Sequence, residues 1–304
     1  MSWLPTADPV CTEGAPGTVD VVLEGRRRDL GGFSVQRVLP ASARRMVGPF
    51  IFFDHFGPTT FAPGAGMSVR PHPHINLATV TYLFDGEIVH RDSLGSHQVI
   101  RPGEVNWMTA GRGIVHSERT GEERLATGGG LHGIQLWVAL PTAHEETAPA
   151  FHHHDAASLP RLSAPGLDLR LIAGHAWGQT APVATVSPLF YADAALDPGG
   201  VVALPDDHPQ RAAYVATGRV RAGGQSFEAG RMIVFHPGMA ASVQAETPAR
   251  VLLLGGAPLD GERHIFWNFV SSRRERIEEA KRAWKEGHFP RVPGDERELI
   301  PLPE

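Results

Sequence analysis

Two histidines of this chain stand two residues apart in the segment Pro71-His72-Pro73-His74. In an extended strand, side chains at i and i+2 leave the same face, so both imidazoles can reach one metal ion. Pro73 favours the extended conformation and lacks an N–H, which an edge strand does not need. With 16 histidines in 304 residues, about one such pair is expected by chance, so this pair needs support from its surroundings.

A second pair with the same spacing is His116-Ser117-Glu118, which follows a turn at Gly111-Arg112-Gly113. If the two strands meet inside a small barrel, three imidazoles and one carboxylate surround one point and leave coordination positions open. This donor set suits Fe(II), Mn(II), Ni(II) or Zn(II) and excludes a soft thiolate site. A closed structural zinc site would more often use cysteines.

Other histidines are weaker candidates. His152, His153 and His154 stand among prolines, which is more typical of an exposed linker than of a second site. His55 lies beside aromatic residues, and two interpretations stay open. It lines the entrance to the metal pocket and contacts substrate, or it is a packing residue with its hydrogen bonds satisfied.

The elements that must position these residues are strands. Short β-type runs, separated by turn residues, occupy 19–23, 33–39, 78–84 and 133–140. The chain contains 34 Gly and 26 Pro, which favours tight turns over long helices. Many short strands at close spacing predict an all-β sandwich or barrel, with the jelly roll among the candidates.

A Pro-rich segment divides the chain, and strands resume after it, from 167 to 254. We therefore predict a first unit at 1–141, a linker at 142–166 and a second unit at 167–304.

The second unit repeats the first. Tyr214 matches Tyr82, and Gly230 matches Gly103 if the second copy has a shorter loop. An internal duplication of one barrel is the simplest account. In this alignment the four candidate ligand positions carry no imidazole in the second unit, since they become Leu204, Asp206, Val243 and Ala245. The second unit is therefore expected to bind no metal.

One helix is predicted, at 272–286. Ser272 and Glu275 have the spacing of a capping box. Ile277, Ala280 and Trp284 share one face, and Gly287 supplies a C-terminal stop.

The composition limits which binding partners and which cellular compartment are expected for the protein. The formal net charge is −5, and Lys and Arg are scattered, so direct nucleic-acid binding is not expected. The chain has one cysteine, Cys11, no signal-peptide pattern at its start and no apolar run of membrane-span length. These features predict a soluble, cytoplasmic protein without a membrane partner.

The stretch 70–118 resembles the pirin family, a branch of the cupins. The resemblance rests on the segments His72-Pro73-His74, Thr79-Val80-Thr81-Tyr82-Leu83, His90-Arg91-Asp92-Ser93-Leu94-Gly95, Arg101-Pro102-Gly103 and Trp107-Met108-Thr109-Ala110-Gly111-Arg112-Gly113-Ile114-Val115-His116-Ser117-Glu118. It implies a bicupin, in which two jelly-roll β-barrels pack together with a short C-terminal helix. It also places the family's metal ligands on His72, His74, His116 and Glu118, and Glu118 is the expected catalytic residue. One divalent transition metal per chain is implied, with Fe(II) expected and Mn, Ni or Zn as alternatives.

The chain departs from the family pattern at two positions. Ile75 replaces a basic residue, and Ala78 replaces an acid that is expected near the metal. The four ligand positions are unchanged, so these departures bear on the choice of substrate and on acid–base chemistry.

Two functions follow from the resemblance. The first is a metal-dependent dioxygenase, an oxidoreductase that cleaves quercetin or a related flavonol or enediol with O₂. The second is a metal- or redox-sensing regulator that acts through a protein partner, like the transcriptional co-regulators in the family. Oxygen uptake with a flavonol panel would support the enzyme, whereas metal-dependent partner binding without turnover would support the regulator.

Overall fold

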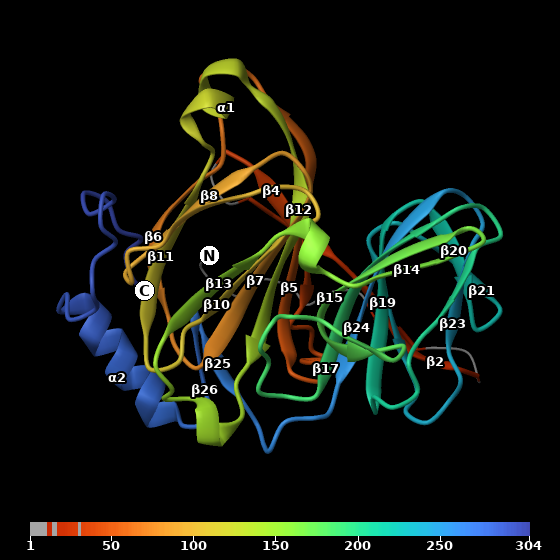
Figure 1. Ribbon diagram of the computed structural model, residues 1–304. Helices are drawn as coiled ribbons and strands as arrows, with labels where there is room; N and C mark the ends of the chain where they lie inside the picture. Colours follow the sequence, from red (N-terminus) through yellow and green to blue (C-terminus); the bar gives the residue numbers. More distant parts are fainter. Residues whose placement is uncertain (1–10, 14–16, 30–31) are drawn as a thin grey trace.

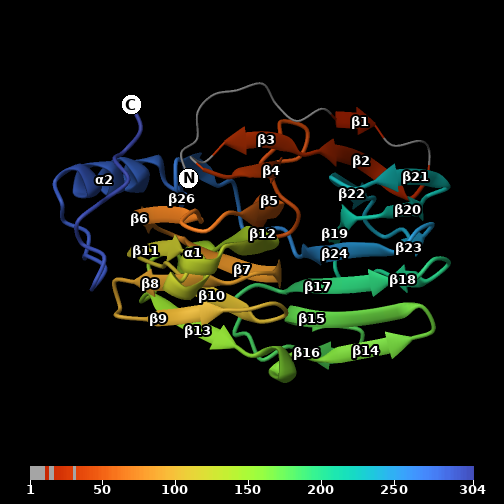
Figure 2. The same ribbon diagram turned by 90° about the horizontal axis from the view of Figure 1, so that it is seen from above.

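The protein consists of two β-barrels that lie side by side. The computed structural model describes residues 11–13, 17–29 and 32–304. The C-terminal helix α2 (Arg274–Lys285) lies on the outer side of the first barrel (Figures 1 and 2). The prediction of an all-β, two-barrel fold with a short C-terminal helix is confirmed.

The first barrel is built from a seven-stranded and a four-stranded sheet. The larger sheet has the strand order β13 (Ala150–His154), β10 (Val105–Thr109), β7 (Leu77–Asp85), β12 (Gly129–Ala139), β5 (Phe50–Phe61), β4 (Ser34–Leu39), β3 (Arg26–Asp29). The smaller has the order β6 (Ser68–His74), β11 (Ile114–Arg119), β8 (Ile88–Asp92), β9 (His97–Ile100). A short helix, α1 (Glu122–Thr127), connects β11 to β12.

The second barrel has the same plan. Its larger sheet has the order β1 (Cys11–Glu13), β2 (Val19–Glu24), β22 (Arg231–Phe235), β19 (Gln210–Thr217), β24 (Ala249–Gly256), β17 (Leu189–Leu196), β15 (Leu167–Ala176), β14 (Arg161–Ala164), and β16 (Gln179–Thr180) pairs with β15. Its smaller sheet has the order β18 (Val201–Ala203), β23 (Ser242–Ala245), β20 (Arg219–Ala222), β21 (Gln225–Glu228). The hairpin β25 (His264–Phe266) and β26 (Phe269–Ser271) precedes α2.

The two barrels correspond strand by strand, as the predicted duplication requires. The central order β10-β7-β12-β5 of the first larger sheet matches β22-β19-β24-β17 of the second. The predicted glycine match is also borne out, since both residues have a positive φ, +81° at Gly103 and +88° at Gly230. The N–H of Gly103 donates to Leu83 at 3.0 Å, and the N–H of Gly230 donates to Val215 at 2.8 Å. These carbonyls follow Tyr82 and Tyr214 by one residue each.

Four strands lie outside the units to which the sequence assigned them: β1 and β2, which join the second barrel, and β13 and β14, which belong to the predicted linker. Strand β2, predicted within 1–141, pairs with β22 of the second barrel. The predicted linker 142–166 contains β13, which pairs with β10 of the first barrel. In both places an added strand covers the backbone N–H and C=O groups of a neighbour that would otherwise be an edge. Residues 141 and 167 as boundaries of independently folding units stay a prediction.

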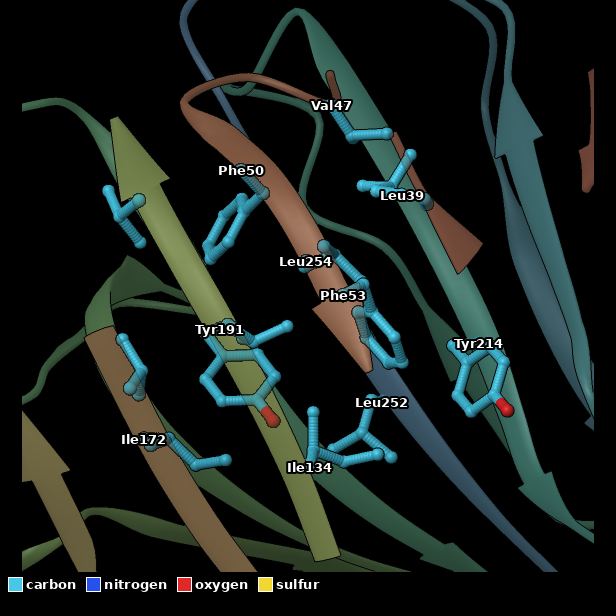
Figure 3. Close-up of a cluster of buried hydrophobic side chains, with 14 of the residues drawn as sticks. Leu39, Val47, Phe50, Phe53, Ile134, Ile172, Tyr191, Tyr214, Leu252 and Leu254 are labelled. Carbon is cyan, nitrogen blue, oxygen red and sulfur yellow. The ribbon is translucent and has the colours of Figure 1, made fainter. Parts of the chain in front are cut away.

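The contact between the barrels is a large apolar cluster. Phe50, Phe53 and Ile134 of the first barrel meet Tyr191 and Tyr214 of the second (Figure 3). The rings of Phe53 and Tyr214 have centroids 4.5 Å apart. Because both larger sheets bury one face here, the barrels are fixed to each other by the hydrophobic effect.

Helix α2 buries the predicted face, made of Ile277, Ala280 and Trp284, but it lacks the predicted capping box. The hydroxyl of Ser272 instead donates to the buried carboxylate of Glu145 at 2.9 Å. The buried face packs beside the first barrel in one cluster with Ile75. Gly287, with a φ of +73°, follows the helix as predicted. Among the described residues no helix is long and apolar enough to cross a membrane.

Candidate metal centre

Three of the four predicted ligands converge inside the first barrel. Strands β6 and β11 are antiparallel neighbours, with His72 opposite His116 and His74 opposite Ile114. The Nε2 atoms of His74 and His116 lie 3.2 Å apart. One nitrogen from each of the three histidines lies within 4.8 Å of the other two. All three side chains are buried.

The other ring nitrogen of His72 and of His116 meets a neighbouring group, whereas Nδ1 of His74 is buried without a hydrogen bond of normal geometry. Nδ1 of His72 donates to the carbonyl of Arg70 at 2.8 Å. The backbone of Asn268, in the hairpin before α2, interacts with His74. Nδ1 of His116 lies 3.4 Å from Nδ1 of His90. Such contacts hold the rings with Nε2 pointing at a common point, as in proteins where histidine binds a metal.

Burial keeps these imidazoles neutral at pH 7. Loss of solvent lowers the pKa of His72, His74 and His116 well below the ordinary value, and the neighbouring histidines lower each one further. A metal ion therefore meets free lone pairs rather than protons.

Glu118 lies on the same strand but does not complete the cluster in this structure. The register of β11 against β6 shifts between His116 and Glu118. The group formed by His72, His74 and His116, whose ligand atoms lie within 4.8 Å of one another, does not include Glu118. Oε1 of Glu118 accepts a hydrogen bond from Thr81 at 3.2 Å. Burial raises the pKa of this carboxyl, although His90 and Thr81 act in the opposite direction.

A small cavity lies beside Glu118. Its volume is about 20 Å³, enough for one water molecule. Most of its wall is apolar, and it is lined by Phe33, Val35, Asp54, Phe56, Met67, Val69, Ile88, Glu118 and Gln135. The polar side chains of the wall are therefore few, namely Asp54, Glu118 and Gln135.

His55 does not line this cavity. Its Nδ1 lies 2.9 Å from the hydroxyl of Tyr214, and its Nε2 lies 2.7 Å from Nε2 of His132. Burial, reinforced by His132, lowers the pKa of His55 to about 3. These contacts favour the packing interpretation, and a role of His55 at the entrance to the metal pocket stays a prediction. Along β5 the side chain of His55 points toward the second barrel, while Asp54 points to the cavity.

The two departures from the family pattern also lie away from the cavity. Ala78 belongs to the apolar cluster between the barrels, so the expectation that this position lies near the metal is wrong for this chain. Ile75 is fully buried beneath the α2 face. Alternation along β7 explains the first result, because the residues that face the barrel interior include Thr81, not Ala78.

The histidine triplet is part of a strand rather than of a free linker. His153 pairs with Asn106 across β13 and β10, and its Nδ1 lies 2.8 Å from the Asn106 side-chain oxygen. Its Nε2 lies 3.3 Å from Asp155 and 3.8 Å from Glu104. Glu104, His153 and Asp155 thus form a second group whose ligand atoms lie within 4.8 Å of one another, but Asp155 is exposed, and exposed acidic groups commonly stand together without a metal.

The second barrel has valines where the first has its central histidines. In the equivalent strand pair, Val202 lies opposite Val243, and both are buried. If Val243 is the counterpart of His116, as the alignment predicts, then Val202 rather than Leu204 is the counterpart of His72. Among the described residues of this barrel, no three His, Cys, Asp or Glu side chains cluster at ligand distance.

The sequence analysis missed several residues that surround the centre. His90 and Asp92 repeat the i, i+2 spacing on strand β8, a signal that was available. Thr81 and Gln135, which meet at 2.8 Å, come from two other strands. Asn268 comes from a distant hairpin, and no local pattern marks it.

Comparisons with known proteins follow the same division into two barrels. The sequence profile of the pirin family matches residues 32–138, and that of the pirin C-terminal cupin domain matches residues 191–290. A pirin-like protein of Caulobacter vibrioides is 54% identical over 289 residues, which cover 94% of this chain and 100% of that protein. A Pseudomonas aeruginosa protein with the provisional name quercetin 2,3-dioxygenase is 44% identical over 260 residues, or 84% of this chain and 80% of that protein. The crystal structure of a quercetin 2,3-dioxygenase from Acinetobacter baumannii matches with a TM-score of 0.86 and 32% identity, covering 93% of this chain and 94% of that one.

Proposed function

The chain belongs to the pirin family, and from this premise we propose that it is a metal-dependent oxygenase. Its centre is one divalent transition metal in the first barrel, held by His72, His74 and His116 together with Glu118. The single observation that carries the proposal is the convergence of three neutral imidazoles in a buried site.

The donor set fits a divalent transition metal. Three imidazole nitrogens suit Fe(II), Mn(II), Ni(II) or Zn(II), and no thiolate is involved. Glu118 is a buried carboxylate beside them, and a buried charge is costly unless a cation or strong hydrogen bonds compensate it. As the fourth ligand, Glu118 would receive that compensation. Fe(II) is the metal we expect for oxygen chemistry.

When bound, such a metal supplies redox chemistry with O₂ and polarises an enol or catechol oxygen. The protein's own groups then act on the substrate. The apolar cavity wall excludes water, and Thr81 holds the Glu118 carboxylate at the cavity. The proton of an incoming enol would pass to a Glu118 oxygen, since this carboxylate lies at the cavity wall.

The substrate class follows from the family and from the cavity. Relatives carry names that refer to quercetin 2,3-dioxygenase, so a flavonol is the first substrate to test. The cavity beside Glu118 has a volume of about 20 Å³, so a flavonol would have to displace apolar lining such as Phe33 and Met67. A small enediol needs less displacement and belongs in the same panel.

The experiment is oxygen uptake by protein purified under argon and loaded separately with Fe(II), Mn(II), Ni(II) or Zn(II). Flavonol- or enediol-dependent O₂ consumption is expected for one or more redox-active metals, and none for His72→Ala. His97→Ala is the matched control, since His97 is exposed on β9 of the same sheet. Absence of turnover on every flavonol and enediol would overturn the enzyme and favour a regulator that binds a protein partner.

A further inference from the structure

His116 differs from the other two histidines in what its Nδ1 atom meets. His72 donates to a backbone carbonyl, and Nδ1 of His74 is buried without a side chain as its hydrogen-bond partner. His116 instead faces the side chain of His90, with the two Nδ1 atoms 3.4 Å apart. Nε2 of His90 lies 3.0 Å from Oδ2 of Asp92. The three side chains form one buried chain, since none is more than 3% exposed.

The hydrogens in this chain can point in only one direction when Asp92 is ionised and His90 is neutral. A carboxylate accepts and does not donate, so the hydrogen between Asp92 and His90 belongs to Nε2 of His90. A neutral His90 then has a lone pair on Nδ1. The hydrogen between the two rings must therefore sit on Nδ1 of His116, which leaves the lone pair of His116 on Nε2, beside His74.

The structure holds Asp92 and His90 in place. Oδ1 of Asp92 accepts the backbone N–H of Leu94 at 2.9 Å and of Ser96 at 3.1 Å. These two bonds leave Oδ2 for His90. The His90 ring stacks on Phe151 of β13, with centroids 4.3 Å apart and planes 13° apart.

We propose that Asp92 and His90 are positioning residues that set the tautomer of His116 and so direct its Nε2 lone pair at the metal. The inference deepens the proposed function and rests on it only in the identity of the metal site. It also predicts that His116 is a more basic ligand, because an imidazole becomes more basic when it donates to a partner that is itself bonded to a carboxylate. The backbone contacts of His72 and His74 cannot be removed by substitution, so this chain is the adjustable one.

Asp92→Asn is the sharpest test, because the direction of the amide is dictated by the structure. The amide oxygen keeps the place of Oδ1, where Leu94 and Ser96 donate, so the NH₂ group takes the place of Oδ2. It then donates to Nε2 of His90, which shifts the His90 hydrogen to Nδ1. His116 must accept at Nδ1 and carries its hydrogen on Nε2, where it blocks the metal. We expect a loss of zinc affinity of about 100-fold, at the upper end of effects from such partners.

Two substitutions of His90 separate the effect of its hydrogen-bond acceptor, Nδ1, from the effect of its ring stacking on Phe151. His90→Phe keeps the stacking on Phe151 but removes the acceptor, and we expect about a 10-fold loss of zinc affinity. In His90→Asn the side-chain oxygen can stand near the former Nδ1, so the loss should be smaller than with Phe. His97→Asn, at an exposed position on β9, is the control and should match wild type.

The readouts are ¹⁵N NMR of the histidine tautomers in the metal-free proteins and zinc affinity by chelator competition. Metal-free wild type should show His116 protonated on Nδ1, and Asp92→Asn should show it protonated on Nε2. Thermal unfolding of the metal-free variants checks folding, and if Asp92→Asn does not fold, the His90 pair decides by the same spectra. An unchanged His116 tautomer in Asp92→Asn, or equal zinc affinity in His90→Phe and wild type, would overturn the proposal. If wild type binds no zinc, the proposed function fails, while the tautomer spectra still decide the role of Asp92 and His90.

Discussion

The two barrels share their strand order, yet they use the same strand pair in opposite ways. In the first barrel, β6 and β11 bring His72 opposite His116, and in the second, β18 and β23 bring Val202 opposite Val243. All four side chains are buried. The second barrel thus shows that this architecture folds around an apolar interior without a metal ligand at these positions.

The comparison separates the residues that the fold requires from those that could bind the metal. The turn glycines and the core tyrosines occur in both copies, whereas the histidines, Asp92 and Glu118 occur in the first alone. In the first barrel, polar side chains with fixed hydrogen-bond partners replace apolar packing. Substitutions in the first barrel should therefore change metal binding, and matched substitutions in the second should change stability.

The largest effect is expected from removal of one histidine ligand. His72→Ala or His116→Ala should lower metal affinity by more than the roughly 10- to 100-fold that loss of a supporting partner costs. Oxygen-dependent turnover should disappear. Folding should survive, because the apolar cores of the two barrels bury most of the surface. Chelator competition and circular dichroism measure the two properties, and wild-type affinity in either variant would remove that histidine from the site.

Acid should destabilise the metal-free protein, because it has buried histidines at the metal site and at the contact between the two barrels. The pKa of His72, His74 and His116 is lowered by burial, as is that of His55. Below about pH 6.5 the unfolded chain binds protons that the folded chain does not, so stability falls as the pH falls. The loss is up to about 2 kcal/mol per histidine at pH 5. Urea unfolding at pH 7 and pH 5 tests this, and equal stability at both would show that these imidazoles are already protonated in the fold.

Val243→Ala, the matched change in the second barrel, should affect stability alone. Removal of two buried methyl groups opposite Val202 should lower the free energy of unfolding by about 2 kcal/mol, including the effect of the cavity that is left behind. Zinc affinity should stay at the wild-type value. A fall in zinc affinity comparable to that of His116→Ala would mean that the second barrel takes part in metal binding.

Among substitutions of the four proposed ligands, Glu118→Gln should have the smallest effect on affinity, because an amide oxygen can still coordinate. Activity should change all the same, since the carboxylate offsets the charge of the metal and tunes its redox potential. Turnover and affinity measured together on iron-loaded protein separate the two effects. A loss of affinity as large as that of His72→Ala would show that the negative charge is essential for binding.

The sequence predicted the parts of the molecule that local spacing encodes. The two i, i+2 pairs placed three histidines in one cluster, and the matched turn glycines revealed the duplication. The alternation of apolar and polar residues predicts which face of a strand is buried but not which sheet the strand joins. The sequence therefore did not predict that β2 joins the second barrel and β13 the first. The spacing of Ser272 and Glu275 predicted a capping box, but in the structure the hydroxyl of Ser272 donates a hydrogen bond to the buried carboxylate of Glu145. Contacts from distant segments, such as Asn268 beside His74, depend on the tertiary fold.

The central claim is that the first barrel holds one metal and the second holds none. Anomalous diffraction from a crystal of protein loaded with a transition metal tests it most directly. We expect one peak per chain, bonded to Nε2 of His72, His74 and His116 and to a Glu118 oxygen, and no peak between Val202 and Val243. A metal elsewhere in the chain, or none at the three histidines of fully loaded protein, would contradict it.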